Sequence, residues 1–210
     1  IGGSSGAVEM LVTLYFGGVL KYNLADATDE DRDRVLIRGH LGPLRYKIFS
    51  LIGFISETEL SHYRQFGSRL PGHEDHLETP GVDITPSGSL GMVLSYGVGC
   101  ALSLRNAGKS PLTYVFLGDG EEQEGNVSEA ARHASHLRLG KMVAIIDRNA
   151  KQLSDPTKQT DSSNLAMIWE GYGWHVIPAV NGNDVVELHT AFRLAQTLAS
   201  PDSKPTLIIA

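Results

Sequence analysis

An acidic stretch between two apolar runs carries the residues best suited to metal chemistry. Residues 117–149 read LGDGEEQEGNVSEAARHASHLRLGKMVAIIDRN. Asp119 lies just past the apolar run 113–118, and Asn149 lies just past the run 141–147, 30 residues beyond Asp119. A carboxylate and an amide oxygen are hard ligands suited to Mg²⁺. Gly118 and Gly120 let the backbone approach phosphate groups closely. The pattern predicts half of a metal–diphosphate clamp.

Two simpler interpretations of the same stretch compete with this one. A calcium loop starting at Asp119 requires Gly at its sixth position and Glu at its twelfth. The chain has Glu124 and Ala130 there, so that interpretation fails. An acidic turn that only caps a helix would explain Gly-Asp-Gly on its own equally well. The spacing to Asn149 favours the clamp.

The clamp needs elements that bring its two ends together, and the C-terminal half of the chain provides them. Four short apolar runs predict strands at 113–118, 141–147, 174–180 and 206–210. Helices are predicted at 126–139, with Asn126 as N-cap and Glu129 completing a capping box, and at 184–198. Alternating strands and helices predict an α/β fold, a parallel sheet with helices on both faces. All strands of such a sheet end at one edge, where ligands bind.

The N-terminal half is more irregular. Apolar residues at helical spacing predict helices within 6–21, 43–54 and 88–106. Residues 61–87 are rich in Gly, Pro and His and predict a long ordered loop, a kind of segment that is usually functional. No repeat and no linker divides the chain, so residues 1–210 are expected to form one domain. Because the first residue is Ile1, we expect the natural N-terminus to lie upstream.

Composition excludes several classes of function. The net charge is −6 and the 18 Lys and Arg residues are scattered, which argues against a nucleic-acid surface. No apolar stretch approaches the ~20 residues needed to cross a bilayer, so no membrane association is expected. The single cysteine, Cys100, lies in an apolar run and is interpreted as a core residue rather than a catalytic thiol. Without disulfides, a reducing, cytoplasmic location is expected.

The stretch 117–149 resembles the thiamine diphosphate fingerprint, Gly-Asp-Gly followed about 30 residues later by Asn, and in detail it is similar to the transketolase family. SSGAVEMLVTLYFGGVL, DRDRVLIRGH, FGSRLPGH, TPGVDIT, SGSLG and GYGWHVI follow in that family's order and spacing. The resemblance covers nearly the whole chain and implies the thiamine diphosphate-binding, or diphosphate-domain, fold. Transketolases continue into a pyrimidine-binding and a C-terminal domain. The resemblance therefore implies the N-terminal subunit of a split, two-chain enzyme, with a C-terminal partner subunit in an α2β2 assembly.

The resemblance also assigns residues to the cofactor. Metal ligation by Mg²⁺, or by Ca²⁺ or Mn²⁺ in its place, is implied for Asp119, Asn149 and the backbone carbonyl of Lys151. Contacts with thiamine diphosphate are implied for His40, Gly88, Ser89, Leu90, Gly118, Asp119, Gly120, Asn149 and Leu153.

Catalytic roles follow from the same resemblance. The implied reaction moves a two-carbon ketol unit from a ketose phosphate to an aldose. His40 resembles the histidine between the diphosphate and the substrate, and His73 resembles the one that hydrogen-bonds the donor sugar. Histidines suit proton transfers near neutral pH. Glu124 and Glu129 are implied in a carboxylate network that leads to a glutamate of the partner subunit, which activates the cofactor.

The chain departs from the family beside the cofactor, and this leaves other functions open. Met92-Val93 replaces the usual Gln-Gly, and one residue is inserted around Pro86-Ser87. A repurposed subunit that passes the two-carbon unit to a carrier-bound acceptor, or a non-catalytic scaffold, is one alternative. A hydrolase is the other, because residues 2–6 match G-x-S-x-G. A nucleophile elbow must follow a strand, however, and none is predicted before Ser4.

Overall fold

The computed structural model describes residues 2–84, 89–149, 151–152, 155–156 and 161–210. A five-stranded sheet with every neighbouring pair parallel forms its centre, in the order β1-β2-β3-β7-β6. Its strands are β1 (Arg34–Ile37), β2 (Thr113–Gly118), β3 (Met142–Asp147), β6 (His175–Ile177) and β7 (Thr206–Ile209). Two short strands, β4 (Lys151–Gln152) and β5 (Asp155–Pro156), pair antiparallel outside it. The predicted parallel α/β fold is confirmed.

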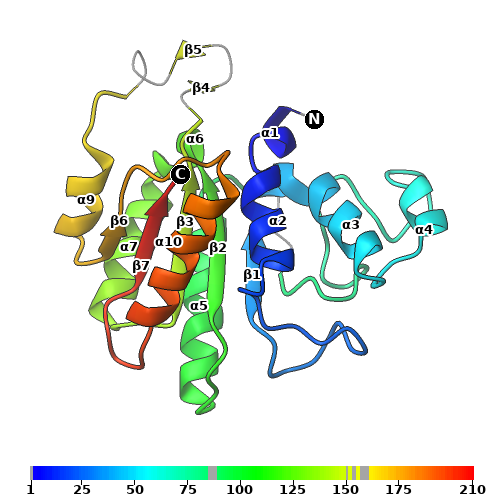
Figure 1. The fold of residues 1–210 in the computed structure, drawn as a ribbon, viewed down its shortest axis with the longest axis horizontal. Helices are drawn as coiled ribbons and strands as arrows, with labels where there is room; N and C mark the ends of the chain where they lie inside the picture. Colours follow the sequence, from blue (N-terminus) through cyan, green and yellow to red (C-terminus); the bar gives the residue numbers. More distant parts are fainter. Residues whose placement is uncertain (1, 85–88, 150, 153–154, 157–160) are drawn as a thin grey trace.

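Helices cover both faces of this sheet (Figure 1). One face carries α2 (Val8–Phe16) and α10 (Val185–Leu198); the other carries α5 (Met92–Asn106), α7 (Gly125–His136) and α9 (Leu165–Gly171). The remaining helical segments are α1 (Gly2–Ser5), η1 (Gly39–Leu41), α3 (Gly42–Leu51), α4 (Glu57–Ser61) and α6 (Asp119–Glu122). In Figure 1, α3 and α4 extend beyond β1, away from the rest of the sheet. No helix among the described residues is long and apolar enough to span a membrane.

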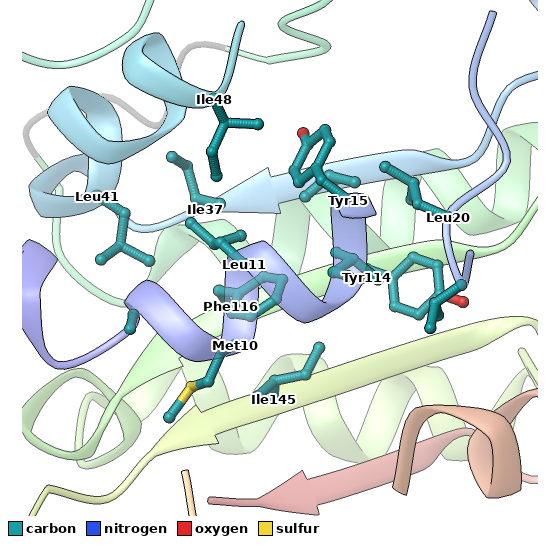
Figure 2. Packing of buried hydrophobic residues seen from close by; sticks show 14 of the residues in the cluster. Met10, Leu11, Tyr15, Leu20, Ile37, Leu41, Ile48, Tyr114, Phe116 and Ile145 are labelled. Carbon is teal, nitrogen blue, oxygen red and sulfur yellow. The ribbon is translucent and has the colours of Figure 1, made fainter. Parts of the chain in front are cut away.

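The apolar runs of β2 and β3 are buried along their whole length because helices cover both faces. Successive side chains of a strand point to opposite faces, so each strand contributes to two cores. Tyr114 and Phe116 pack on the α2 side, whereas Val115 and Leu117 pack on the α5 side. Figure 2 shows the first core, where Met10, Leu11 and Tyr15 of α2 meet strand residues. This packing holds the carboxyl ends of the strands in a fixed order.

Several predicted boundaries need correction. The helix predicted within 6–21 is the single helix α2, which ends at Phe16 because Gly17 and Gly18 (φ +69°) form a turn, and the separate short helix α1 precedes it. The prediction of Asn126 as N-cap is wrong. Helix α7 already begins at Gly125, with an extended Glu124 (φ −67°, ψ 135°) before it, and Asn126 donates to the Met92 sulfur at 3.3 Å.

Other differences concern short strands and one helix start. Strand β1 was not among the four predicted strands, because its four residues are too few for a strand pattern to stand out. Strand β6 ends at Ile177, since Pro178 lacks the N–H that a ladder needs. Helix α5 starts only at Met92, because Gly91 has a φ of +86°, outside the helical range. From His62 to residue 84 the chain forms turns, as the predicted loop requires.

The hydrolase alternative is not supported. Residues 2–5 form the short helix α1, and no strand precedes Ser4 in the described chain. The Ser4 hydroxyl is buried and donates a 2.7 Å hydrogen bond to the carbonyl of His40. Such a side chain ties α1 to the turn at residue 40 and does not present an exposed nucleophile.

Candidate functional site

The ends of β2 and β3 meet at one edge of the sheet. Gly118 and Asp147 are register partners, so Asp119 and Asn149 follow from neighbouring positions. Asp119 opens α6, and its Oδ1 accepts the N–H of Gly120 at 2.8 Å. Both predicted metal ligands influence the pKa of Asp147. The Asn149 side chain hydrogen-bonds the Asp147 carboxylate and lowers this pKa, whereas the negative charge of Asp119 raises it. The edge therefore gathers two carboxylates and an amide.

A buried ion pair that the sequence reasoning missed supports this edge from below. Arg38 follows β1, and its Nη2 lies 2.6 Å from Oδ2 of Asp147, with side-chain exposures of 7% and 3%. The same guanidinium donates to the carbonyls of Leu117 (3.0 Å) and Gly3 (3.1 Å). Burial nevertheless raises the pKa of Asp147, against the attraction of Arg38. Arg38 thus joins the ends of three strands and α1.

Gly118 leaves space for the Arg38 guanidinium in this arrangement. A Cβ at Gly118 would lie 2.8 Å from Nη1 of Arg38, closer than such contacts occur. The first glycine of Gly-Asp-Gly therefore makes room for the guanidinium beneath the loop, in addition to freeing the backbone as the sequence predicts.

Glu121 is a second residue that the sequence reasoning missed. Its buried carboxylate accepts the N–H of Gly91 at 3.1 Å and that of Gly118 at 3.4 Å. Burial is the main reason why its pKa is raised. Glu121 therefore couples the 89–91 turn to the Gly-Asp-Gly turn. The acidic run 119–124 was a signal for a carboxylate here, but not for which residue turns inward.

The 89–91 turn also fits tightly against α7. Ser89 and Leu90 are exposed, with Leu90 at 45%. A Cβ at Gly91 would lie 2.6 Å from that of Glu124. Two predicted cofactor residues, Ser89 and Leu90, therefore precede a glycine that contacts both Glu121 of α6 and Glu124, the residue before α7. Gly88 lies outside the described residues.

His40 and His73, 33 residues apart in the chain, lie side by side. Their ring centroids are 5.9 Å apart and the rings meet edge to face at 84°. Gly39 allows this approach, because a Cβ there would stand 2.7 Å from Nδ1 of His73. Partial burial of the His40 ring lowers its pKa, and the charges of His73 and Arg38 lower it further. His40 is therefore neutral near pH 7 and can accept a proton.

The loop that carries His73 is anchored to α3 by buried polar groups. Nη1 of Arg45 lies 3.0 Å from Oε1 of Glu74, and both side chains are essentially inaccessible. The Tyr46 hydroxyl donates to the carbonyl of Pro71 at 3.0 Å. Helix α3 begins two residues after His40, so one helix positions both histidines. The sequence contained no signal for this pairing.

The chain matches a known protein family over nearly its whole length. The sequence profile of the family described as transketolase, thiamine diphosphate binding domain, matches residues 2–210. The chain belongs to the transketolase family. It is 36% identical over 209 residues to the chloroplastic transketolase of Spinacia oleracea, covering 93% of this chain and 28% of that protein. With transketolase 1 of Saccharomyces cerevisiae it is 40% identical over 190 residues, covering 85% and 27%.

Solved transketolase structures share the fold. The Campylobacter jejuni transketolase superimposes with a TM-score of 0.87 at 30% identity, over 96% of this chain and 32% of that one. The Pichia stipitis transketolase in complex with sedoheptulose 7-phosphate gives 0.86 at 28% identity, over 97% and 34%. The chain thus spans about a third or less of these relatives, and the fold is that of the transketolase thiamine diphosphate-binding domain.

The candidate metal ligands are oxygen atoms of two side chains and one backbone carbonyl. Across the described part of the chain, no group of three His, Cys, Asp or Glu side chains is placed to hold a metal ion. The predicted set differs in kind, because it combines the Asp119 carboxylate, the Asn149 amide and the carbonyl of Lys151 in β4. These oxygen donors fit a hard cation that keeps places for phosphate oxygens and water. Leu153, also predicted to contact the cofactor, lies outside the described residues.

The remaining predicted residues lie on α7 and the preceding turn. Glu124 and Glu129 are both exposed, and Glu124 packs beside Gly91. Met92 and Val93, where transketolases were expected to have Gln-Gly, form the first turn of α5, and Val93 is buried. This departure therefore replaces one polar side chain and one glycine with two apolar side chains directly after the 89–91 turn.

Proposed function

We propose that this chain supplies the thiamine diphosphate-binding domain, residues 1–210, of a transketolase that moves a two-carbon ketol unit from a ketose phosphate to an aldose. The observation that carries the proposal is the meeting of Asp119, Asn149 and Asp147 at the carboxyl ends of two neighbouring strands. The family match over residues 2–210 supports the choice of cofactor.

Each residue at the edge receives a role in this proposal. Asp119, Asn149 and the Lys151 carbonyl would hold Mg²⁺, and the Gly120 amide would bind the diphosphate beside it. Gly118, Ser89 and Leu90, with Gly88 and Leu153, would line the cofactor. Arg38 would keep the Asp147 carboxylate from competing for the metal, since it neutralises that group from below.

The two histidines face the reacting part of the substrate in this proposal. When bound, thiamine diphosphate supplies the carbanion that cleaves a bond next to a carbonyl. His40, neutral at pH 7, would accept a proton from a substrate hydroxyl, and His73 would hydrogen-bond the donor's oxygen atoms. Their edge-to-face contact keeps both imidazoles on one side of the site.

The proposal includes a partner. The chain spans 28% of the length of the chloroplastic relative, and its family match is to the thiamine diphosphate-binding domain. We propose a C-terminal transketolase subunit in an α2β2 assembly, with Glu124 and Glu129 directed toward the partner's glutamate. The unpaired Cys100 suits a reducing, cytoplasmic location for this assembly.

The decisive experiment uses the full-length protein, tagged and isolated from its own host. Mass spectrometry of co-purifying proteins and an assay for bound thiamine diphosphate would be run on the same eluate. A stoichiometric partner with a pyrimidine-binding domain, together with the cofactor, is the expected result. A lone chain without cofactor would overturn the proposal. A screen of sugar phosphates and carrier-bound aldehydes would then distinguish a sugar transketolase from the repurposed subunit.

A residue-level test accompanies it. Asp119→Ala should weaken metal-dependent binding of thiamine diphosphate by at least the ~10–100-fold typical of groups that only support a metal ligand. The control is Asp31→Ala, a carboxylate whose side chain is 72% exposed. Calorimetric titration measures both, and circular dichroism checks that each variant is folded. Equal affinity in the two variants would remove Asp119 from the site.

A further inference from the structure

A cavity lies at the opposite edge of the sheet from the Asp119 site. It has a volume of about 170 Å³ and is bounded by the end of α5, the turn after α7 and the turn before β7. Strand β2 runs for six residues from this edge to Gly118, so the two sites are separated by about 20 Å. The lining residues are Ala101, Leu104, Arg105, Gly108, Lys109, Ser110, Pro111, Arg138, Leu139, Gly140, Lys141, Pro201 and Asp202.

Positive charge gathers around this cavity. Four cationic side chains line it, from Arg105, Lys109, Arg138 and Lys141, against the single acidic residue Asp202. The whole chain has a net charge of −6, so this cluster is a local reversal of sign. Lys109 is already paired, with its Nζ 2.5 Å from Oε2 of Glu30. The other three cations therefore decide what the cavity attracts.

Those three cations bind neutral backbone carbonyls. Arg105 donates to Leu137 O, Arg138 Nε donates to Asp202 O at 2.5 Å, and Lys141 Nζ donates to Ser110 O at 2.8 Å. Within the described chain, none of the three forms an ion pair with an acidic side chain. Cations near helix ends stabilise terminal carbonyls, which accounts for the bond from Arg105. A carbonyl leaves the formal charge uncompensated, so an anion still gains from binding here.

The cavity also has an apolar wall. Leu104, Pro111, Leu139 and Pro201 contribute carbon surface to the same lining. A concave site with apolar walls and a few convergent polar groups is the usual form of a small-molecule site. Its volume suits a ligand with one charged group and a short apolar body.

We propose that this cavity binds a small organic anion, whose phosphate or carboxylate group meets Arg105, Arg138 and Lys141 while its apolar body lies against Leu104 and Leu139. This site is separate from the cofactor edge and does not depend on the proposed transketolase activity. Arg138 and Lys141 lie in the turn between α7 and β3, the strand that leads to Asn149. An anion bound there would stiffen the start of that strand.

The test is calorimetric titration of the full-length protein with three related probes: phenyl phosphate, benzoate and neutral phenol. Phenyl phosphate and benzoate should bind, more weakly at high salt, and phenol should not. Arg138→Gln/Lys141→Gln should weaken phenyl phosphate binding by about ten-fold or more, as expected when hydrogen bonds to a charged group are lost. The control is Arg132→Gln/Arg193→Gln, which removes two exposed cations outside the cavity.

Binding must also survive saturation with thiamine diphosphate, and it must survive Asp119→Ala. Displacement by the cofactor would assign the probe to the other edge and overturn the proposal, while leaving the proposed function untouched. Equal affinity in the two double variants would overturn it as well, and so would phenol binding as tightly as phenyl phosphate. Thermal melting of each variant confirms that the fold is retained.

Discussion

The buried Arg45–Glu74 pair should respond to substitution in a way that identifies what it does. The two side chains are 0% and 1% exposed, and their closest atoms are 3.0 Å apart. Arg45 also donates to the carbonyl of Val35 at 2.5 Å, while Arg45 Nε and Glu74 Oε2 lack hydrogen-bond partners in the described structure. Glu74→Met would leave a buried guanidinium with one neutral acceptor. At pH 8 this should reduce the free energy of unfolding by ~3–5 kcal/mol.

Replacing both partners should have the opposite outcome. Arg45→Met/Glu74→Met removes both desolvated charges and keeps the volume apolar, so its stability should match the wild type or exceed it by ~1–4 kcal/mol. Urea denaturation followed by the fluorescence of the buried Trp169 and Trp174 measures this. With a slope of ~2 kcal/mol per molar urea, the single variant's midpoint should fall by about 2 M.

An exposed pair that joins α3 to α4 serves as the control. Lys47 and Glu57 approach to 3.2 Å, but their side chains are 49% and 82% exposed. Glu57→Met should therefore change stability by less than ~1 kcal/mol. The reasoning is refuted if Glu74→Met costs no more than this control, or if the double variant is as unstable as the single one. The first result would mean that the Arg45 charge reaches solvent, and the second that two methionines do not pack in place of the ion pair.

Three further predictions concern pH, a turn and a thiol. Burial raises the pKa of Glu74 from 4.5 to about 7, so the folded protein holds a proton that the unfolded chain loses. Stability should fall as pH rises between these values, and the fall should be smaller in Arg45→Met/Glu74→Met, as measured by urea midpoints at both ends of the range. Gly91→Ala should destabilise the protein by ~1 kcal/mol or more, because the φ of Gly91 is +86° and a Cβ there would press on Glu124. Gly99→Ala, on the open side of α5, should instead stabilise the protein by ~0.5–1 kcal/mol. Thermal denaturation of both variants tests this, and equal effects would contradict it. Burial raises the pKa of Cys100 to about 11, so iodoacetamide at pH 8 should label it roughly 100-fold more slowly in the folded protein than in urea, and equal rates would show an accessible thiolate.

Strands were predictable from the sequence where their residues are buried on both faces. The runs 113–118 and 141–147 are continuously apolar, and they form β2 and β3 close to their predicted limits. Their parallel pairing followed from the helix between them. The placement of Asp119 and Asn149 at one edge followed in turn, because both lie just past the ends of neighbouring strands. Local sequence patterns were sufficient to predict these strands, because whether a strand is buried on both faces is visible in its own residues.

Local patterns failed where one residue outweighed the periodicity. Strand β1 has only four residues, too few for alternation to stand out, and it forms because β2 offers a free edge. The start of α7 moved ahead of Asn126 because the preceding turn leaves Glu124 extended. The extended backbone of Glu124 sets the start of α7, and the packing of Glu124 against Gly91 accompanies that conformation.

The sequence alone therefore determined the fold class, the sheet edge at which Asp119 and Asn149 meet, and the types of residue at that edge. Only the tertiary structure decided which charged groups support it. Arg38 meets Asp147 across 109 residues, Arg45 meets Glu74 across 29, and Glu121 reaches Gly91 across 30. Nothing in the local sequence selects these partners. Each pairing depends on the order of the strands and on which charged side chains are buried between the packed layers. A buried charge takes whichever partner the fold places within reach, because the alternative is desolvation without compensation.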